Sequence, residues 1–159
     1  IDLSVEEAPP VSVVLAALGP KMLDFAGRES AGTLTWMAGH TALRDHIVPR
    51  ITTAAKAAGR PAPRVIAGLP MAITNDTAKA LEVAAKVFAI YPKLPAYRDM
   101  LDRGGLSEPT EVALIGDAAT VSGQIKRLED FGVTDMCGYS FLADDDAFER
   151  TADFLGSLT

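Results

Sequence analysis

The sequence contains little cysteine, little positive charge and no long hydrophobic run, and each shortage excludes a class of protein. Its single cysteine, Cys137, cannot form an internal disulfide, which favours a reducing, cytoplasmic compartment. The 15 Lys and Arg against 21 Asp and Glu give a formal charge of -6, which repels phosphodiester backbones, so we expect no nucleic-acid partner. The longest apolar stretch, Val11 to Leu18, is shorter than the ~18 to 20 residues of a membrane span, so we expect no membrane partner.

What is present is the composition of an ordinary globular protein. Hydrophobic residues make up 48% of the 159 residues and charged residues 23%, which suits one packed domain or one piece of a larger domain. The sequence opens with Ile1 rather than methionine, and residues 1–10 are typical of a linker inside a longer polypeptide. We therefore expect this chain to be part of a longer one.

Apolar runs and helical periodicity alternate along the sequence. Nearly continuous apolar runs predict strands at 11–18, 33–37, 64–73 and 133–141, with a shorter run at 112–115. Apolar residues at helical spacing predict helices around 22–26, 43–58, 77–89, 97–103, 121–131 and 148–155. Pro49 lies inside the second of these helices and predicts a bend near Val48, because an interior proline removes a hydrogen bond.

This alternation predicts an α/β fold with a parallel sheet and right-handed crossovers. Four strong strands are few for an open doubly wound sheet and are half of an eight-stranded barrel, which typically needs ~250 residues. Residues 91–107 form an insertion that is too long for an ordinary connection between a strand and a helix, and such insertions often carry function.

The common catalytic and nucleotide-binding motifs are missing. His40 and His46 lie six residues apart, on largely opposite faces of a helix, so we expect no metal site. Cys137 falls within the last predicted strand with no histidine after it, so we expect a buried, inert thiol. Neither a G-x-G-x-x-G nor a G-x-x-x-x-G-K-[ST] motif occurs, and no catalytic residue can be assigned.

One turn has the chemistry of an anion site. It joins the first strand to a helix and consists of Ala16, Ala17, Leu18, Gly19 and Pro20. Small residues and a glycine let the backbone approach a ligand, and the helix N-terminus offers free N–H groups, with Lys21 as a further cation. A Gly-Pro pair between a strand and a helix is also common turn chemistry, so the pattern alone leaves both interpretations open.

Several segments carry a resemblance to a known family. They are Pro10-Val-Ser-Val-Val-Leu-Ala-Ala-Leu-Gly-Pro-Lys-Met-Leu23, His46-Ile-Val-Pro-Arg50, Ala57-Ala-Gly-Arg-Pro61, Leu94-Pro-Ala-Tyr-Arg-Asp-Met-Leu101, Ile115-Gly-Asp117 and Phe131-Gly-Val-Thr-Asp135. In this order they resemble luciferase-like oxidoreductases, especially the branch that uses the deazaflavin coenzyme F420. The resemblance covers essentially the whole chain, but only the C-terminal half of such an enzyme.

The resemblance implies a (β/α)8 barrel whose strands five to eight lie in residues 1–159. It places the cofactor phosphate at the turn from Ala16 to Pro20, with Trp36 lining the cofactor pocket or else filling the core. It places the insertion 91–107 at the barrel mouth, where Tyr91, Tyr97 and Arg98 would contact substrate or pack a lid helix. Much of the cofactor and substrate site would come from the missing half, so we do not expect this chain alone to catalyse.

The resemblance leaves three functions open. The first is an oxidoreductase in which coenzyme F420 moves a hydride to or from an organic substrate. The second is a flavin mononucleotide (FMN)-dependent monooxygenase of the same barrel family. The third is a non-catalytic half-barrel that only assembles. Because a half-barrel leaves two sheet edges and one apolar face uncovered, we expect a homo-oligomer or docking with the missing N-terminal half.

Overall fold

The computed structural model describes residues 11–141 and 143–158, which contain five parallel strands in one sheet. The strands are β1 (Val14–Ala16), β2 (Gly32–Trp36), β3 (Arg64–Ile73), β4 (Leu114–Gly116) and β5 (Asp135–Ser140). The strand predicted at 64–73 is confirmed at both ends, whereas the one predicted at 11–18 is shorter. The linker predicted at 1–10 lies outside the described residues.

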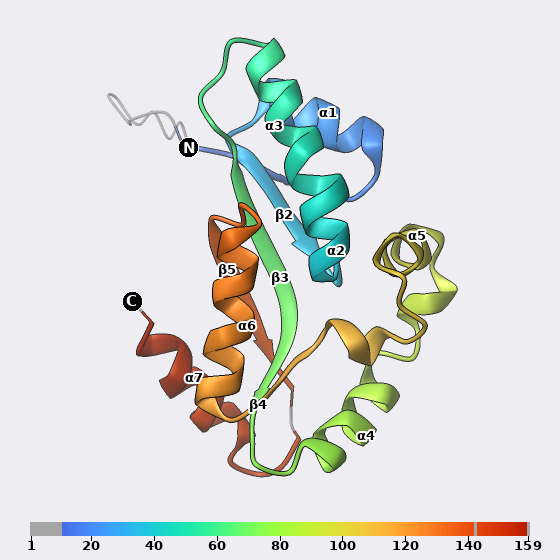
Figure 1. Cartoon of the computed structure of the whole chain (residues 1–159), viewed down its shortest axis with the longest axis vertical. Coiled ribbons are helices and arrows are strands. Elements are labelled where there is room, and N and C mark those ends of the chain that lie inside the picture. Colours follow the sequence, from blue (N-terminus) through green and yellow to red (C-terminus); the bar gives the residue numbers. More distant parts are fainter. Residues whose placement is uncertain (1–10, 142, 159) are drawn as a thin grey trace, which may run out of the picture.

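The long strand β3 is the centre of the sheet, and its register fixes the strand order (Figure 1). β2 pairs with residues 64–68 of β3, β4 pairs with 71–73, and β5 pairs with 66–71. Residues 66–68 of β3 pair with both β2 and β5, and Met71 pairs with both β4 and β5. Because a strand has only two edges, β5 lies along one edge of β3, and β2 and β4 lie along the other. The result is a curved sheet of four strands across, which is half of a (β/α)8 barrel.

Helices follow the strands, as the periodicity predicts. They are α1 (Pro20–Glu29), α2 (His40–Ala42), α3 (Val48–Ala57), α4 (Thr77–Val87), α5 (Pro95–Gly104), α6 (Ala118–Asp130) and α7 (Ala147–Gly156). A π-helical turn, Leu43–Ile47, joins α2 to α3, so the helical ladder is irregular directly before Pro49, where a bend was predicted. In the described part of the chain no helix is long and apolar enough to cross a membrane.

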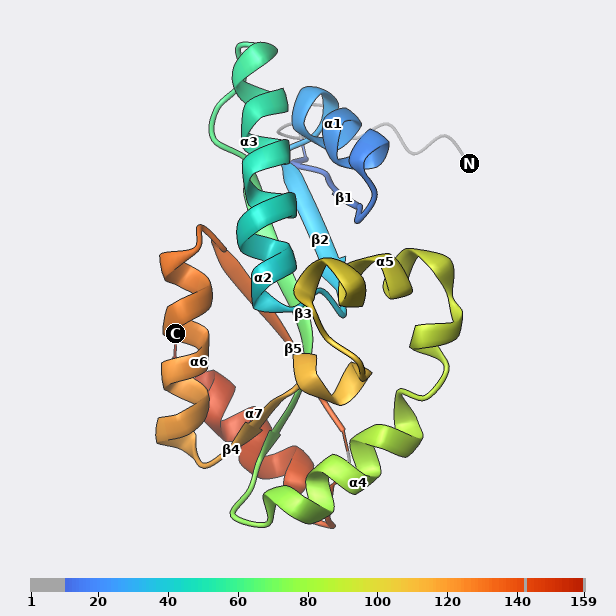
Figure 2. The same cartoon turned by 45° about the vertical axis from the view of Figure 1, so that its right-hand side comes forward.

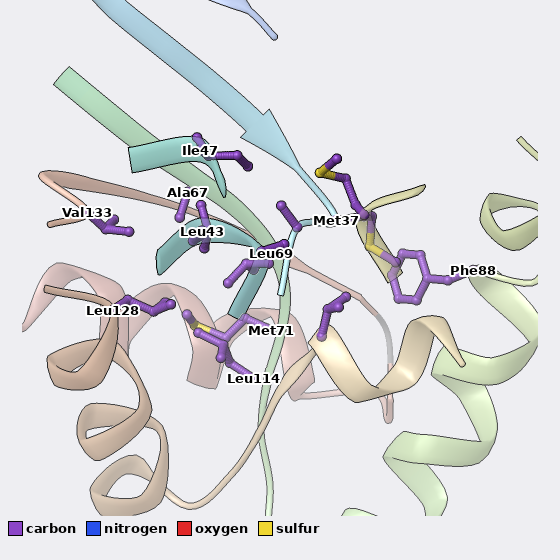
Figure 3. Packing of buried hydrophobic residues seen from close by; sticks show 14 of the residues in the cluster. Met37, Leu43, Ile47, Ala67, Leu69, Met71, Phe88, Leu114, Leu128 and Val133 are labelled. Atoms are coloured by element: carbon purple, nitrogen blue, oxygen red, sulfur yellow. The ribbon is translucent and has the colours of Figure 1, made fainter. Parts of the chain in front are cut away.

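The core lies between one face of the sheet and the helices that cover it. Figures 1 and 2 show α1 beside α3 near one end of the sheet, and α6 and α7 beside β5. Leu23 of α1, Ile51 of α3 and Leu69 of β3 are almost completely buried. Figure 3 shows Leu69 and Met71 in the middle of this packed cluster. Burial of such side chains contributes about 1.5–3 kcal/mol each.

The other face of the sheet is uncovered, and this corrects one prediction. Leu34 and Tyr139 on this face are 37% and 50% exposed. Cys137 was predicted to be buried and is exposed instead. Its neighbour Gly138 faces the helices, because a Cβ there would lie 3.0 Å from Leu155 of α7. Side chains alternate along a strand, so Cys137 points to the opposite, uncovered face, which in a complete barrel is the interior.

Candidate functional site

A cavity of about 320 Å³ opens where β1 and β2 end. The lining residues come from the turn after β1, the first turn of α1, strand β2 and helix α5: Ala16, Ala17, Leu18, Gly19, Met22, Leu34, Trp36, Ala96 and Tyr97. Figure 2 shows α5 close to the arrowhead of β2, which places the insertion beside this cavity. The carboxyl ends of parallel strands are where barrel enzymes bind their ligands, so this cavity is the candidate site.

The turn after β1 presents backbone to the cavity. Gly19 is the N-cap of α1 and Pro20 occupies its first position, as predicted. A Cβ built on Gly19 would meet no atom within 4 Å, so the absent side chain leaves open space rather than a packing contact. The first bond of the helix runs from the Leu23 N–H to the Gly19 carbonyl at 3.0 Å. The N–H groups of Lys21 and Met22 precede it and are therefore free of helical partners, which suits an anion.

Thr33 fixes the end of β1 on which this turn is built. Its hydroxyl donates a hydrogen bond to the Leu15 carbonyl at 2.9 Å and lies 3.3 Å from the Ala17 carbonyl. Thr33 is completely buried, so this bond is shielded from water. Thr33 is a site residue that could not be predicted, because a buried threonine in a strand has no sequence signature beyond its β propensity.

An aromatic cluster surrounds Trp36, and it extends from the cavity across the end of the sheet. Its members are Trp36, Phe88, Tyr91, Tyr97, Tyr139 and Phe141. The Trp36 ring is 5.6 Å from Tyr139 and 6.1 Å from Tyr91, centroid to centroid, and both contacts are edge to face. Tyr91 also packs against Tyr97 at 4.8 Å. The structure thus brings Trp36, predicted at a strand end, together with Tyr91 and Tyr97, predicted in the insertion.

Tyr97 lines the cavity and keeps its phenol protonated. Burial raises the pKa of this phenol, and the neighbouring Tyr91 raises it further. A group whose ordinary pKa is about 10 therefore stays protonated at neutral pH. Tyr97 can donate a hydrogen bond to a bound ligand, but it is poorly suited to act as a base.

Arg98 does not line the cavity, although it belongs to the same helix. Its Nε donates to Asp102 Oδ1 at 2.9 Å, and its Nη2 donates to the Leu106 carbonyl at 2.8 Å. A third bond reaches the Ser107 carbonyl. These bonds tie α5 to the chain that follows it, which is the packing alternative considered for this residue. A contact between Arg98 and substrate stays a prediction.

Two larger cavities lie elsewhere. One of about 530 Å³ is lined by residues of α1, α3 and the π-helical turn, on the outer side of the sheet. Another of about 450 Å³ lies beyond β3, where Asp76, Asp117 and Asp144 meet Arg150. Asp117 and Asp76 cap helices there, and Asp144 pairs with Arg150 at 2.7 Å. Within residues 11–141 and 143–158 no group of three His, Cys, Asp or Glu side chains could hold a metal ion.

Comparison with known proteins points to one family. A family model described as luciferase-like monooxygenase matches residues 2–138. No curated protein sequence matches the chain. Several solved structures share its fold. One is the coenzyme F420-dependent tetrahydromethanopterin reductase of Methanopyrus kandleri, at 24% identity and a TM-score of 0.75 over 92% of this chain.

Two further solved structures show the same fold with different cofactors. An F420-dependent secondary alcohol dehydrogenase, in complex with an F420-acetone adduct, matches 95% of this chain with 17% identity and a TM-score of 0.74. The oxygenating constituent of 3,6-diketocamphane monooxygenase from Pseudomonas putida, in complex with FMN, matches 94% with 16% identity and a TM-score of 0.66. These alignments cover 48% to 49% of the three solved chains, so this chain spans about half their length.

Proposed function

This chain belongs to the luciferase-like monooxygenase family, and from that premise we propose that it is the C-terminal half of an oxidoreductase that binds coenzyme F420. The cofactor would transfer a hydride to or from an organic substrate. Two of the solved structures that share the fold are named as F420-dependent, which supports this cofactor. We call the chain together with its proposed other half the assembled barrel.

The observation that carries the proposal is the cavity between the turn after β1 and the aromatic cluster. The backbone of the turn from Ala16 to Pro20 would hold the anionic part of the cofactor: Ala16, Ala17, Leu18 and Gly19 line the cavity, and Pro20 begins α1. The N–H groups at the start of α1 and the helix dipole favour a negative charge there by about 0.3–1 kcal/mol. No side chain that lines the cavity is charged, and Lys21 follows the turn directly.

The apolar part of the cavity suits a planar ring. Leu34 and Met22 supply apolar surface, Trp36 supplies an aromatic ring, and Tyr97 supplies one hydrogen-bond donor. A bound deazaflavin supplies hydride chemistry, while the protein binds, orients and shields it. Tyr91 packs edge to face against Trp36, Tyr97 packs against Tyr91, and both would contact substrate. Substrate identity depends in part on the other half of the barrel.

The uncovered sheet face favours assembly with another half-barrel. Within the described residues β1 pairs only with β2, and β5 pairs only with β3, so each leaves an edge without a partner. Exposed edges and exposed apolar side chains such as Leu34 and Tyr139 are a liability unless they are covered. We propose that the N-terminal half of the barrel, or a second copy of this chain, covers them.

Two other functions remain as alternatives. An FMN-dependent monooxygenase is favoured by the FMN-bound solved structure with the same fold. A half-barrel that only assembles is favoured by the uncovered face alone. The experiment that separates the three is a titration of the assembled barrel with coenzyme F420 and, separately, with FMN. Saturable quenching of deazaflavin fluorescence supports our proposal, binding of FMN alone supports the monooxygenase, and binding of neither supports the association module.

A further inference from the structure

We propose that His46 and Arg50 are positioning residues, which hold the turn after β1 in the shape that binds the cofactor. Neither side chain lies among those that line the candidate cavity. Each reaches the turn from the outer side, across the boundary between α1 and α3. This inference rests on the proposed function, since it assigns to the turn the role of cofactor binding.

His46 bonds the turn at Leu18. Its Nε2 lies 3.0 Å from the Leu18 carbonyl oxygen, and both groups are partly buried. A carbonyl oxygen only accepts hydrogen bonds, so Nε2 must carry the proton and donate it. Leu18 lines the cavity, and its peptide group leads directly to Gly19. The bond therefore fixes the orientation of the peptide plane that enters the candidate anion site.

Arg50 bonds the turn at Pro20, two residues after Leu18. Its Nε donates to the Pro20 carbonyl at 2.9 Å, and its Nη2 donates to Asp24 Oδ2 at 2.7 Å. Pro20 is the first residue of α1, and Asp24 lies one turn later in the same helix. One guanidinium group thus holds the start of α1 at two points. Together with His46 it brackets Gly19 between two anchored carbonyl groups.

The local backbone explains how one helix reaches both carbonyls. The π-helical turn Leu43–Ile47 contains His46 and runs directly into α3, which carries Arg50. Turns of this kind shift the side chains that follow and often occur at functional sites. Residues four apart lie on one helix face, so His46 and Arg50 point the same way.

Close packing makes α1 and α3 a single support for the turn. A Cβ built on Gly27 of α1 would lie 2.6 Å from the Ile51 carbonyl of α3 and 2.7 Å from the Ala54 Cβ. Such an approach is possible only with glycine. The two helices are therefore held at a fixed separation. The hydrogen bonds from His46 and Arg50 to the carbonyl groups of the turn depend on this separation.

The test uses variants of the assembled barrel that differ in donor position. His46→Gln places an amide nitrogen the same number of bonds from the backbone as Nε2, whereas His46→Asn places it one bond nearer and out of reach. His46→Leu and Arg50→Met remove the donors. Thr53→Ala is the control, since Thr53 lies on α3 and bonds only the Pro49 carbonyl of its own helix among the described residues. The dissociation constant for coenzyme F420 and for FMN, kcat, KM and the melting temperature are measured for each variant.

We expect His46→Asn, His46→Leu and Arg50→Met to raise the dissociation constant of the cofactor by about 3- to 10-fold, the effect of one lost hydrogen bond. His46→Gln should stay close to wild type, as should Thr53→Ala, and kcat at saturating cofactor should not change. Unchanged affinity in His46→Asn, or an equal loss in His46→Gln, would overturn the inference.

A further variant distinguishes positioning of the turn from a general loss of stability, because it lowers the melting temperature as much as His46→Asn does but at a site away from the turn. Leu128→Val in α6 should lower the melting temperature without touching the turn, because Leu128 lies near Met71 and Leu114 in the core (Figure 3). If it weakens cofactor binding as much as His46→Asn at the same melting temperature, the inference is wrong. A wild-type protein that binds neither cofactor instead contradicts the proposed function.

Discussion

The ring of Trp36 packs edge to face against the ring of Tyr139, with centroids 5.6 Å apart and planes at 80°. Trp36 ends β2 and Tyr139 lies on β5, so the contact reaches across β3, the strand between them. Gly68 of β3 makes this possible, because a Cβ there would lie 3.2 Å from the Trp36 ring and 2.4 Å from the Thr35 carbonyl. Glycine at this position of the central strand thus leaves room for the rings of the aromatic cluster.

Trp36 is the only tryptophan in the chain and therefore reports on the candidate site. If the other half of the barrel contributes tryptophans, they are first replaced by phenylalanine. We expect the emission of Trp36 to be quenched as coenzyme F420 or FMN saturates the cavity, because the ring would lie against the cofactor. Trp36→Phe should lose this signal and weaken binding, as measured by cofactor fluorescence. Unquenched Trp36 emission in a protein with bound cofactor would place the cofactor elsewhere.

Gly27 should be the glycine of the helices that least tolerates a side chain. Gly27→Ala places a methyl group 2.6 Å from the Ile51 carbonyl, and we expect a loss of about 1–3 kcal/mol in the free energy of unfolding. The matched control is Gly123→Ala in α6, where a Cβ meets nothing within 4 Å. There, alanine should stabilise the helix by about 0.5–1 kcal/mol. Equal effects of the two variants in chemical denaturation would contradict the close approach of α1 and α3.

The pair of Arg64 and Asp135 should make stability depend on pH. Arg64 donates hydrogen bonds to both carboxylate oxygens, and Thr134 donates a further one, which together lower the pKa of Asp135. A lowered pKa stabilises the folded state above about pH 4, the ordinary value for aspartate, and this is lost as the pH falls through the folded-state value.

We therefore expect Asp135→Asn to cost about 0.5–1 kcal/mol of unfolding free energy at pH 7, since the pair is partly exposed. The difference from wild type should vanish in acid. Glu82→Gln, in an exposed pair with Lys86 on α4, should change little at any pH. A difference for Asp135→Asn that is constant from pH 2 to pH 7, in denaturation curves, would show that charge is not its cause.

Cys137 should report on assembly of the barrel. It is exposed on the uncovered face, so its thiol in the isolated chain should react with a disulfide reagent as readily as an open surface thiol. In the assembled barrel the same side chain faces the interior, and the reaction should slow by about tenfold or more. A control thiol at Ser122→Cys, on the exposed side of α6 in a Cys137→Ser background, should react equally in both states.

An equal rate for Cys137 before and after assembly would show that the inner face of the sheet stays open. The proposal that another half-barrel covers this face would then be wrong. A slow rate in the isolated chain would indicate that two copies associate through this face, because self-association also protects the thiol. Sedimentation then shows whether the isolated chain is a monomer or an oligomer.

Much of the fold follows from local patterns in the sequence. The strand at 64–73 follows Pro61 and Pro63 and is buried along most of its length, so its apolar run coincides with the whole element. The first strand was predicted too long, because Val11 and Val13 look like strand residues. In the structure they are 84% and 55% exposed, and β1 has a single partner strand among the described residues.

The candidate site was only partly predictable, since its parts meet through tertiary packing. The turn after β1 has a local signature of small residues before Gly-Pro, and it does line a cavity. Phe88, Tyr139 and Phe141 were missed, because one aromatic residue at a helix or strand end is indistinguishable from core packing. The bonds of Arg98 to carbonyl groups of its own insertion could not be predicted either, because they depend on how that loop folds back.

The most direct test of the central claim places a side chain at position 19. Gly19 has an ordinary extended backbone conformation and open space around its Cα, so Gly19→Leu should fold with an unchanged melting temperature. In the assembled barrel the leucine would fill the cavity, and the dissociation constant for coenzyme F420 or FMN should rise by about tenfold or more, equivalent to about 1.4 kcal/mol. Wild-type affinity in Gly19→Leu would contradict the assignment of this turn to cofactor binding.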